Sequence, residues 1–243
     1  MTTIVAAGRR VLPRGWKDLA RQVAIWFGFA IAYQFARGLA GHNPTKAFAD
    51  GAKVIELEQR ITTNVWELTF QNFAHSYSWL ATAASWTYWN SEFTVVALSL
   101  LWVYMRRHDS FVRFRNVILL ANVIGLFGYV LVPTAPPRMF TGLGFVDSHH
   151  EGLVQLAANP YAAMPSLHAA DALLLGVMLA ILVRRRIVKI FWLVWPAWVW
   201  FSVVATANHF WLDVVGGIVV AILAAAIVYG RPVVRAALGP LRA

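Results

Sequence analysis

Cysteine is absent from the 243-residue chain, and charged residues make up only 13% of it. Without cysteine the chain can form no disulfide framework, no thiolate metal site and no thiol nucleophile. Any chemistry must therefore use His, Ser, Asp, Arg or Glu. The charged fraction is about half of the roughly 25% found in average soluble domains. A hydrophobic fraction of 59% and a mean hydropathy of +0.59 indicate an integral membrane protein.

Long apolar runs make up most of the chain, and each has close to the ~20 residues that a helix needs to cross a bilayer. We predict an all-α, polytopic membrane protein with six transmembrane helices at 19–40, 86–105, 116–133, 166–183, 188–206 and 210–229. The first two are the least apolar, because Gln34 interrupts one and Asn90 with Glu92 opens the other. The chain is expected to form a single domain, 1–243, with a catalytic core at about 116–229.

The net charge of +10 could indicate a nucleic-acid partner. The basic residues instead form four short clusters between apolar runs: Arg9, Arg10, Arg14, Lys17 and Arg21; Arg106, Arg107, Arg113 and Arg115; Arg184, Arg185, Arg186 and Lys189; Arg231, Arg235 and Arg242. With six spans, all four clusters fall on one side, which the positive-inside rule identifies as the cytoplasm. We therefore expect no nucleic-acid partner, and a multi-pass plasma-membrane protein with both termini in the cytoplasm.

The segment 19–85 is expected to hold an N-terminal anchor and outer-surface interfacial helices. An uncleaved anchor is favoured over a signal peptide, because the basic lead of about 21 residues is long and no clear cleavage site follows. In VIELEQRI and VWELTFQNF, apolar residues recur at near-helical spacing beside Glu56, Glu58, Arg60 and Glu67. This pattern predicts helices on the outer leaflet, with a small soluble cap as the alternative.

Three polar clusters lie on the extracytoplasmic side in this topology: Pro136–Arg138, Pro165–Asp171 and Asn208–Asp213. The first belongs to a Pro- and Gly-rich connection, 134–165, of a length that is usually functional. The other two open the predicted fourth and sixth spans, so residues far apart in sequence are expected to lie close together. This convergence is the main evidence for a site.

The stretch MPSLH is predicted to place Pro165 in the first turn of a helix, with Ser166 and free backbone N–H groups pointing outward. Such a helix start attracts anions. Arg138 adds a guanidinium fork that matches phosphate oxygens. A phosphate group is therefore the predicted guest.

His209 and Asp213 are four residues apart, so on a helix they share a face and can form a hydrogen bond. An aspartate that keeps one imidazole nitrogen protonated leaves the other nitrogen available to attack phosphorus. His168, on the neighbouring helix, can then protonate the departing oxygen. Asn208, beside His209, is a further candidate for a substrate contact or a supporting role.

Other interpretations remain open for several of these residues. His168, His209 and Asp213 could form a two-histidine, one-carboxylate metal site, but Arg138 and the anion-attracting helix start disfavour a cation there. We therefore expect no metal and no cofactor. The histidines could also be solvated helix ends. The pair His149 and His150 is better explained by a solvated loop than by a metal site.

Three acidic or amide residues admit more than one role. Asp171 lies one turn below His168 within apolar sequence. It could orient His168, pair with Arg138, bind a substrate hydroxyl, or face water. Asn90 and Glu92 could contact a polyol head group, although capping of the second span is the more frequent use of such residues.

At this point the residues resemble a known family. PSLH, followed 41 residues later by an H-x-x-x-D element and preceded by an arginine, is similar to the type 2 phosphatidic acid phosphatase superfamily. LH in place of GH, with APPR upstream and NHFWLD downstream, resembles its inositol phosphorylceramide synthase and sphingomyelin synthase branch. The resemblance covers about 116–229. It implies six helices, a phosphohistidine on His209, His168 as acid, Asp213 as orienter, and Arg138 with Ser166 holding the phosphate.

The chain departs from the superfamily at two motifs. The positions of a lysine and a proline near the arginine hold Leu131 and Met139, and Ser202 is followed by Val203 instead of arginine. Fewer cations suit a singly charged phosphodiester better than a dianionic monoester. We therefore expect a lipid phosphotransferase that passes a head-group phosphate to a lipid or polyol acceptor. The alternatives are a lipid phosphate phosphatase and a non-catalytic protein that binds or transports anionic lipid. Donor, acceptor and oligomeric state are not predicted.

Overall fold

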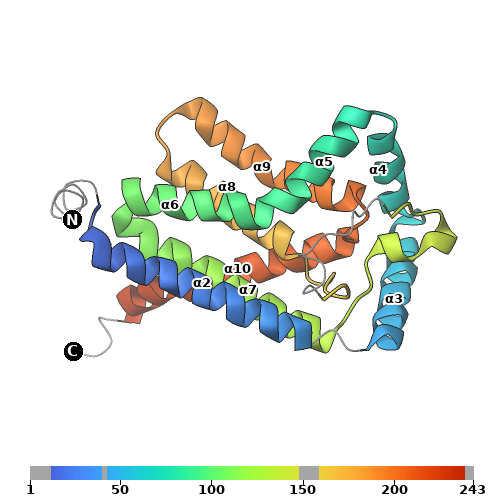
Figure 1. Cartoon of the computed structure of the whole chain (residues 1–243), viewed down its shortest axis with the longest axis horizontal. Helices are drawn as coiled ribbons and strands as arrows, with labels where there is room; N and C mark the ends of the chain where they lie inside the picture. Colours follow the sequence, from blue (N-terminus) through green and yellow to red (C-terminus); the bar gives the residue numbers. More distant parts are fainter. Residues whose placement is uncertain (1–11, 40–42, 148–158, 239–243) are drawn as a thin grey trace.

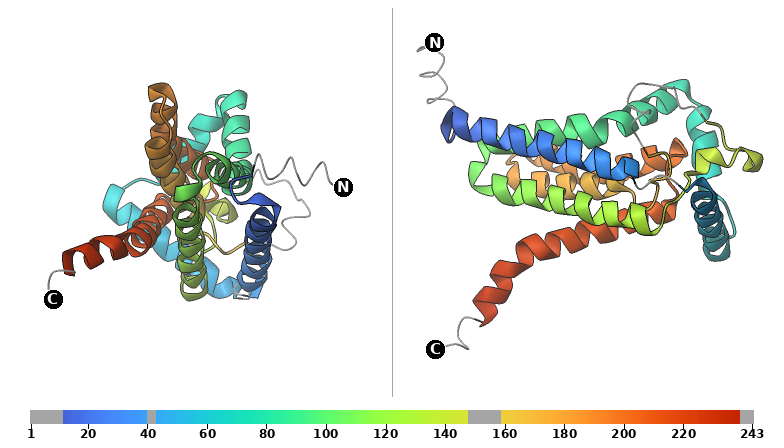
Figure 2. Two further views of the ribbon diagram at one scale, coloured as in Figure 1. Left: turned by 90° about the vertical axis from the view of Figure 1, so that its left-hand side faces the viewer. Right: turned by 60° about the horizontal axis from the view of Figure 1, so that its bottom comes forward.

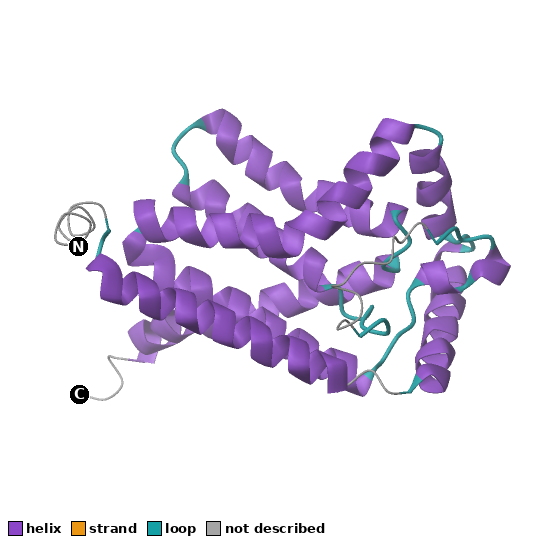
Figure 3. Ribbon diagram, viewed as in Figure 1, coloured by secondary structure: helices purple, strands orange, loops and turns teal. Residues whose placement is uncertain are grey.

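The computed structural model describes residues 12–39, 43–147 and 159–238, which form helices joined by short connections (Figures 1 and 3). No strand is found in these three ranges, so the all-α prediction is confirmed for them. The α-helices are α2 (Gly15–Leu39), α3 (Pro44–Thr62), α4 (Trp66–His75), α5 (Ser78–Asn90), α6 (Val96–Arg106), α7 (His108–Leu131), α8 (Leu167–Leu182), α9 (Arg186–Ala205) and α10 (Trp211–Leu238).

Three of these helices, α7, α9 and α10, are both long enough and apolar enough to cross a membrane. Helix α8 is apolar but has 16 residues. At 1.5 Å per residue it is about 24 Å long, shorter than a hydrocarbon core of about 30 Å. The predicted second span is divided by a π-helical segment, η1 (Ser91–Val95), and α2 begins with charged residues. The count of six spans therefore stays a prediction.

The centre of the bundle is formed by α7, α8 and α10. Buried side chains from all three pack together, among them Ile118 of α7, Leu175 of α8 and Ala224 of α10. The closest approach is at Gly217 of α10, where an added Cβ would lie 2.1 Å from the carbonyl oxygen of Ser166. Small residues allow such backbone contact between membrane helices. The start of α8 is therefore held directly against α10.

The two ends of the bundle differ. The α6–α7 and α8–α9 junctions lie at the end where α2 begins and α10 ends, whereas α3 lies across the opposite end (Figures 1 and 2). Arg107 donates from Nε to the carbonyl oxygen of Leu182 at 2.9 Å, which links the α6–α7 junction to the end of α8. Arg9, Arg10 and Arg242 lie outside the described residues. Which end faces the cytoplasm stays a prediction.

Candidate active site

Two histidines from separate elements lie side by side at the end of the bundle where α3 crosses. His168 is in the first turn of α8, and His209 lies in the turn between α9 and α10. Their ring centroids are 5.6 Å apart. His209 is 3% exposed, so its imidazole is almost completely shielded from solvent. The close contact of α8 and α10 at Gly217 brings these two rings together although 41 residues separate them.

The imidazole of His209 is oriented mainly by the main chain. Its Nδ1 lies 2.8 Å from the carbonyl oxygen of Ala163 and 3.5 Å from Oδ2 of Asp213. A carbonyl oxygen can only accept, so Nδ1 carries the proton and Nε2 keeps its lone pair. The sequence pattern predicted a shared helical face for His209 and Asp213, but His209 lies two residues before α10.

Asp213 has a second partner, because its Oδ2 also accepts a hydrogen bond from the backbone N–H of Phe210 at 2.8 Å. It therefore caps the start of α10 while it faces His209. The contribution of Ala163 could not be found from sequence, because a main-chain acceptor 46 residues away leaves no residue-type signal.

His168 contacts one residue of α5 and one of the π-helical segment that follows it. Its Nε2 lies 3.2 Å from Oε2 of Glu92, and its ring stacks on Tyr88 with centroids 4.5 Å apart. Glu92 belongs to the π-helical segment η1, a local widening of the helix that is frequent at functional sites. A carboxylate at this distance stabilises the protonated imidazole.

The expectation that Asn90 and Glu92 cap a helix is wrong. Helix α5 begins at Ser78 and continues into η1, so these residues are inside a helical stretch. Asn90 makes no side-chain cap bond, and its amide donates to the carbonyl oxygen of Trp86 at 2.8 Å. A contact with a polyol head group is not tested.

Arg138 lies in a short 3₁₀ turn, η2 (Pro137–Met139), beside the histidine turn. Its backbone N–H donates to the carbonyl oxygen of Ala207 at 2.9 Å, and its Nε donates to Oδ1 of Asn208 at 3.1 Å. Its Nη1 lies 3.2 Å from Oδ2 of Asp147. Asn208, the residue next to His209, therefore links the predicted phosphate-binding cation to the histidine turn.

Ser166 is the N-cap of α8. Its hydroxyl accepts from the backbone N–H of Ala169 at 3.3 Å, and its side chain is fully buried. Pro165 therefore precedes the cap, and the expectation that this proline occupies the first helical turn is wrong. This hydrogen bond does not test the predicted contact of Ser166 with phosphate, because it uses the hydroxyl only as an acceptor and leaves its proton available to donate.

Asp171 is buried in the core between α7 and α8, where it is 2% exposed. The side-chain amide of Asn122 donates to its two carboxylate oxygens at 3.3 and 3.2 Å. Asn122 could not be predicted as this partner from sequence, because an amide within an apolar helix does not reveal which group it contacts. The catalytic roles considered for Asp171 stay predictions.

Two buried glutamates beside the site were not recognised as part of it from sequence. Glu67 Oε1 accepts from the backbone N–H of Trp211 at 2.8 Å, and Glu58 Oε1 accepts from that of Leu212 at 3.0 Å. Glu67 is 0% and Glu58 is 1% exposed, although the pattern placed both at a polar surface. Burial, and secondarily the neighbouring Glu67, raises the pKa of Glu58 to about 9. Burial also raises the pKa of Glu67.

The alternative metal site gains no support from the arrangement. Among the residues that the structure describes, no three His, Cys, Asp or Glu side chains are grouped to hold a metal ion. His149 and His150 lie outside the described residues. The histidine site is instead an arrangement of two imidazoles, one guanidinium and several carboxyl groups.

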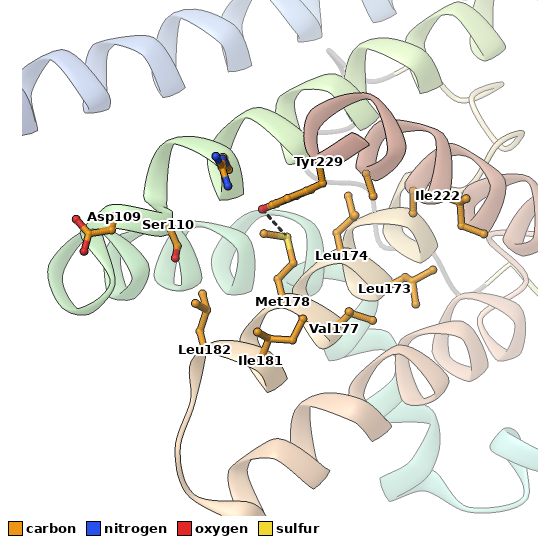
Figure 4. A pocket seen from close by; sticks show the side chains of 13 residues that line it. Asp109, Ser110, Leu173, Leu174, Val177, Met178, Ile181, Leu182, Ile222 and Tyr229 are labelled. Carbon is orange, nitrogen blue, oxygen red and sulfur yellow. Dashed lines mark hydrogen bonds between the residues drawn. The ribbon is translucent and has the colours of Figure 1, made fainter. Parts of the chain in front are cut away.

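A large cavity lies away from these histidines. It has a volume of about 620 Å³ between α7, α8 and α10, with Leu174, Met178 and Ile222 among its apolar lining and Arg113 and Asp109 at its polar edge (Figure 4). The same two helices that carry His168 and Asp213 therefore also border an apolar space. Neither histidine lines it.

Residues 52–227 match a family model described as the PAP2 superfamily. A protein from Bacteroides thetaiotaomicron named phosphoinositol dihydroceramide synthase is 28% identical over 142 residues, which are 49% of this chain and 46% of that protein. The match thus spans less than half of the relative's length. No solved structure matches the chain significantly. Both matches agree with the family resemblance of the sequence motifs.

Proposed function

The chain belongs to the PAP2 superfamily, and from this membership we propose that it is a membrane lipid phosphotransferase that works through a phosphohistidine on His209. The observation that carries the proposal is the pair of imidazoles 5.6 Å apart, each with a different partner. Nδ1 of His209 faces a carbonyl oxygen, and Nε2 of His168 faces the Glu92 carboxylate. One ring therefore suits a nucleophile and the other an acid.

In the first half-reaction, Nε2 of His209 attacks the phosphorus of a lipid phosphodiester. The N–P bond forms as the P–O bond to the donor lipid breaks, and the leaving alkoxide takes a proton from the imidazolium of His168. Glu92 stabilises that imidazolium before the transfer. Arg138 balances the charge on the non-bridging phosphate oxygens.

In the second half-reaction, the hydroxyl of an acceptor lipid attacks the phosphohistidine. Its oxygen forms a bond to phosphorus, its proton goes to the now neutral His168, and the N–P bond breaks to restore His209. No proton or electron is gained or lost over the cycle. The chemistry depends on positioning and charge neutralisation, as is general for phosphoryl transfer.

Transfer is favoured over hydrolysis for two reasons. Arg138 hydrogen-bonds to the histidine turn. Leu131 and Met139 occupy the positions where the superfamily pattern has a lysine and a proline. One guanidinium suits a phosphodiester with a single negative charge. The relative's name, phosphoinositol dihydroceramide synthase, also combines a phosphorylated head group with a lipid acceptor. We accordingly propose a phosphoinositol-type lipid as donor and a ceramide-type lipid as acceptor.

The test is mass spectrometry of lipids incubated with the purified protein, a phosphoinositol phospholipid and dihydroceramide. The expected products are a phosphoinositol dihydroceramide and diacylglycerol. A release of phosphoinositol to water without the ceramide product would show hydrolysis and contradict transfer. If lipid binds but no product forms, the binding or transport alternative replaces the enzyme.

The nucleophile is tested by trapping radiolabelled phosphate on the protein. We expect an acid-labile, base-stable label that is lost in His209→Ala. His75→Ala is the matched control, because His75 is exposed in the last turn of α4. A label that persists in His209→Ala would assign the nucleophile elsewhere.

A further inference from the structure

Three carboxyl groups from three elements cap the start of α10. The backbone N–H groups of Phe210, Trp211 and Leu212 donate to Asp213, Glu67 and Glu58 at 2.8, 2.8 and 3.0 Å. Helix starts attract negative charge, because their first N–H groups have no partner within the helix. The residue before α10 is Phe210, which has no polar side chain, so these acceptors come from elsewhere. Two of the three come from α3 and α4.

Glu58 and Glu67 are too close and too buried to be ionised together. Both are at most 1% exposed; the charge of Glu67 raises the cost of ionising Glu58, whereas a hydrogen bond from Glu58 stabilises the ionised form of Glu67. Oε2 of Glu67 is buried. While all carboxyl groups are ionised, no group donates a hydrogen bond to it. A proton on Glu58 supplies the missing donor. The raised pKa of Glu58, about 9, means that this proton is present at neutral pH.

The capped residues follow His209 directly. Trp211 and Leu212 are two and three positions after it, and the Nδ1 of His209 depends on a 2.8 Å contact with Ala163. A shift of the start of α10 would therefore move the imidazole relative to both Ala163 and His168. Misplacement of a reacting group by about 1 Å can cost about 100-fold in rate.

We infer that Glu58 and Glu67 form a proton-sharing carboxyl pair that fixes the start of α10, and thereby act as positioning residues for the nucleophile His209. The inference rests on the proposed function of His209. It gives α3 and α4, which lie at the end of the bundle beside the start of α10, an indirect part in catalysis through the position of His209 (Figure 1).

The pair predicts a specific response to pH. The titratable groups that act on Glu58 are Glu67 on α4 and Asp213 in the first turn of α10, and Asp213 in turn faces His209. When the pH rises far enough to remove the shared proton, two adjacent negative charges face each other in a buried space. Their repulsion pushes α3 and α4 apart and releases the start of α10.

Glutamine variants separate charge from hydrogen bonding. In Glu58→Gln, the carbonyl oxygen can still accept from Leu212 while the amide donates to Glu67, so the variant imitates the protonated acid. In the double variant Glu58→Gln with Glu67→Gln, the two side-chain carbonyl oxygens accept from the backbone N–H groups of Leu212 and Trp211. The two side-chain NH₂ groups, which can only donate, then face each other. Only the double variant leaves the pair without an acceptor.

The readout is the single-turnover rate at which His209 is labelled with radioactive phosphate, measured against pH. We expect the labelling rate of Glu58→Gln not to show the decline at high pH that the wild type shows. The double variant should label about 100-fold more slowly, in line with a misplaced nucleophile. Glu56→Gln is the control, because Glu56 is on the same helix but exposed and paired with Arg60. It should follow the wild type throughout.

Two results would overturn the inference: wild-type labelling by the double variant, or a high-pH decline in Glu58→Gln identical to that of the wild type. An infrared measurement is independent of activity. The wild type should show the C=O stretch of a buried protonated carboxyl group, and Glu58→Gln should lose it. If the wild type is never labelled yet this band is present, the proposed function fails while the proton-sharing pair stands. A missing band refutes the pair itself.

Discussion

The carbonyl oxygen of Ala163 lies closer to Nδ1 of His209, at 2.8 Å, than the carboxylate of Asp213 does, at 3.5 Å. The main chain therefore fixes the tautomer of the proposed nucleophile. In protease triads the aspartate has this task. Here Asp213 adds negative charge beside the ring and caps α10, but the Nδ1 proton has another acceptor.

This relationship predicts a mild effect of Asp213→Asn. In protease triads, the equivalent change costs about 10⁴-fold because the histidine takes the wrong tautomer. We expect a loss of only about 10- to 100-fold in kcat here, since Ala163 keeps the tautomer and the asparagine oxygen can still accept from Phe210. Asp213→Ala, which loses the cap, should be worse. Kinetics with the lipid donor check this, and an Asp213→Asn protein as inactive as His209→Ala would contradict it.

Glu92 is predicted to support His168 as the acid. Glu92→Gln removes the charge that stabilises the imidazolium while it keeps a polar group 3.2 Å from Nε2. We expect kcat to fall by about 10- to 100-fold, as for other residues that orient a catalytic group, with a smaller change in KM. Thr94→Ala is the matched control, because Thr94 is exposed in the same π-helical segment and its hydroxyl donates locally to Asn90. Equal losses in the two variants would mean that the segment matters only for folding.

Gly217 is predicted to set the distance between the two histidines. A Cβ there would lie 2.1 Å from the Ser166 carbonyl oxygen and 3.1 Å from Cβ of Ala169, so Gly217→Ala must push α10 away from α8. We expect loss of phosphohistidine formation even where the protein is still produced, because in-line attack needs close placement. Gly28→Ala in α2 is the control, since nothing lies within 4 Å of its added Cβ. Normal labelling in Gly217→Ala would exclude this spacing role.

Asn122 and Asp171 are predicted to stabilise the bundle as a pair. In Asp171→Asn one of the two oxygens that accept from the Asn122 amide is replaced by an NH₂ group, at an expected cost of about 1 to 3 kcal/mol in the free energy of unfolding. The double variant Asp171→Asn with Asn122→Asp exchanges the amide and the carboxyl group, and it should recover most of the lost free energy of unfolding. Thermal unfolding in detergent, analysed as a double-mutant cycle, measures the coupling. Purely additive effects would show that the contact contributes nothing.

Glu58 also makes stability depend on pH. Its pKa rises from 4.5 to about 9 on folding, so the folded chain holds one more proton than the unfolded chain between these values. The resulting stabilisation is fully present below 4.5 and is lost as the pH rises towards about 9. We expect Glu58→Gln to unfold with a flatter pH dependence over that range. Denaturant unfolding of both proteins across the range is the measurement, and parallel curves would refute the linkage.

Much of the architecture could be predicted from sequence, with clear exceptions. Apolar length predicted the helices, but the number of spans could not be established, because α8 is short and a π-helical segment divides the second run. Periodicity cannot predict such a segment, since it inserts a local change of pitch. Glu58 and Glu67 were placed at a surface because a helical pattern does not show which element will cover its polar face.

The sequence by itself determined that this protein lies in a bilayer, because its apolar runs are long. It also determined that catalysis must use groups other than thiols, and that the candidate groups lie near the starts of helices. The tertiary structure alone decided which partner each of those residues has. Ala163 faces His209, Glu92 faces His168, and two glutamates hold α10. The physical reason is range: a sequence pattern reports only interactions between residues near in the chain, whereas these hydrogen bonds depend on atoms that the fold brings together from distant segments.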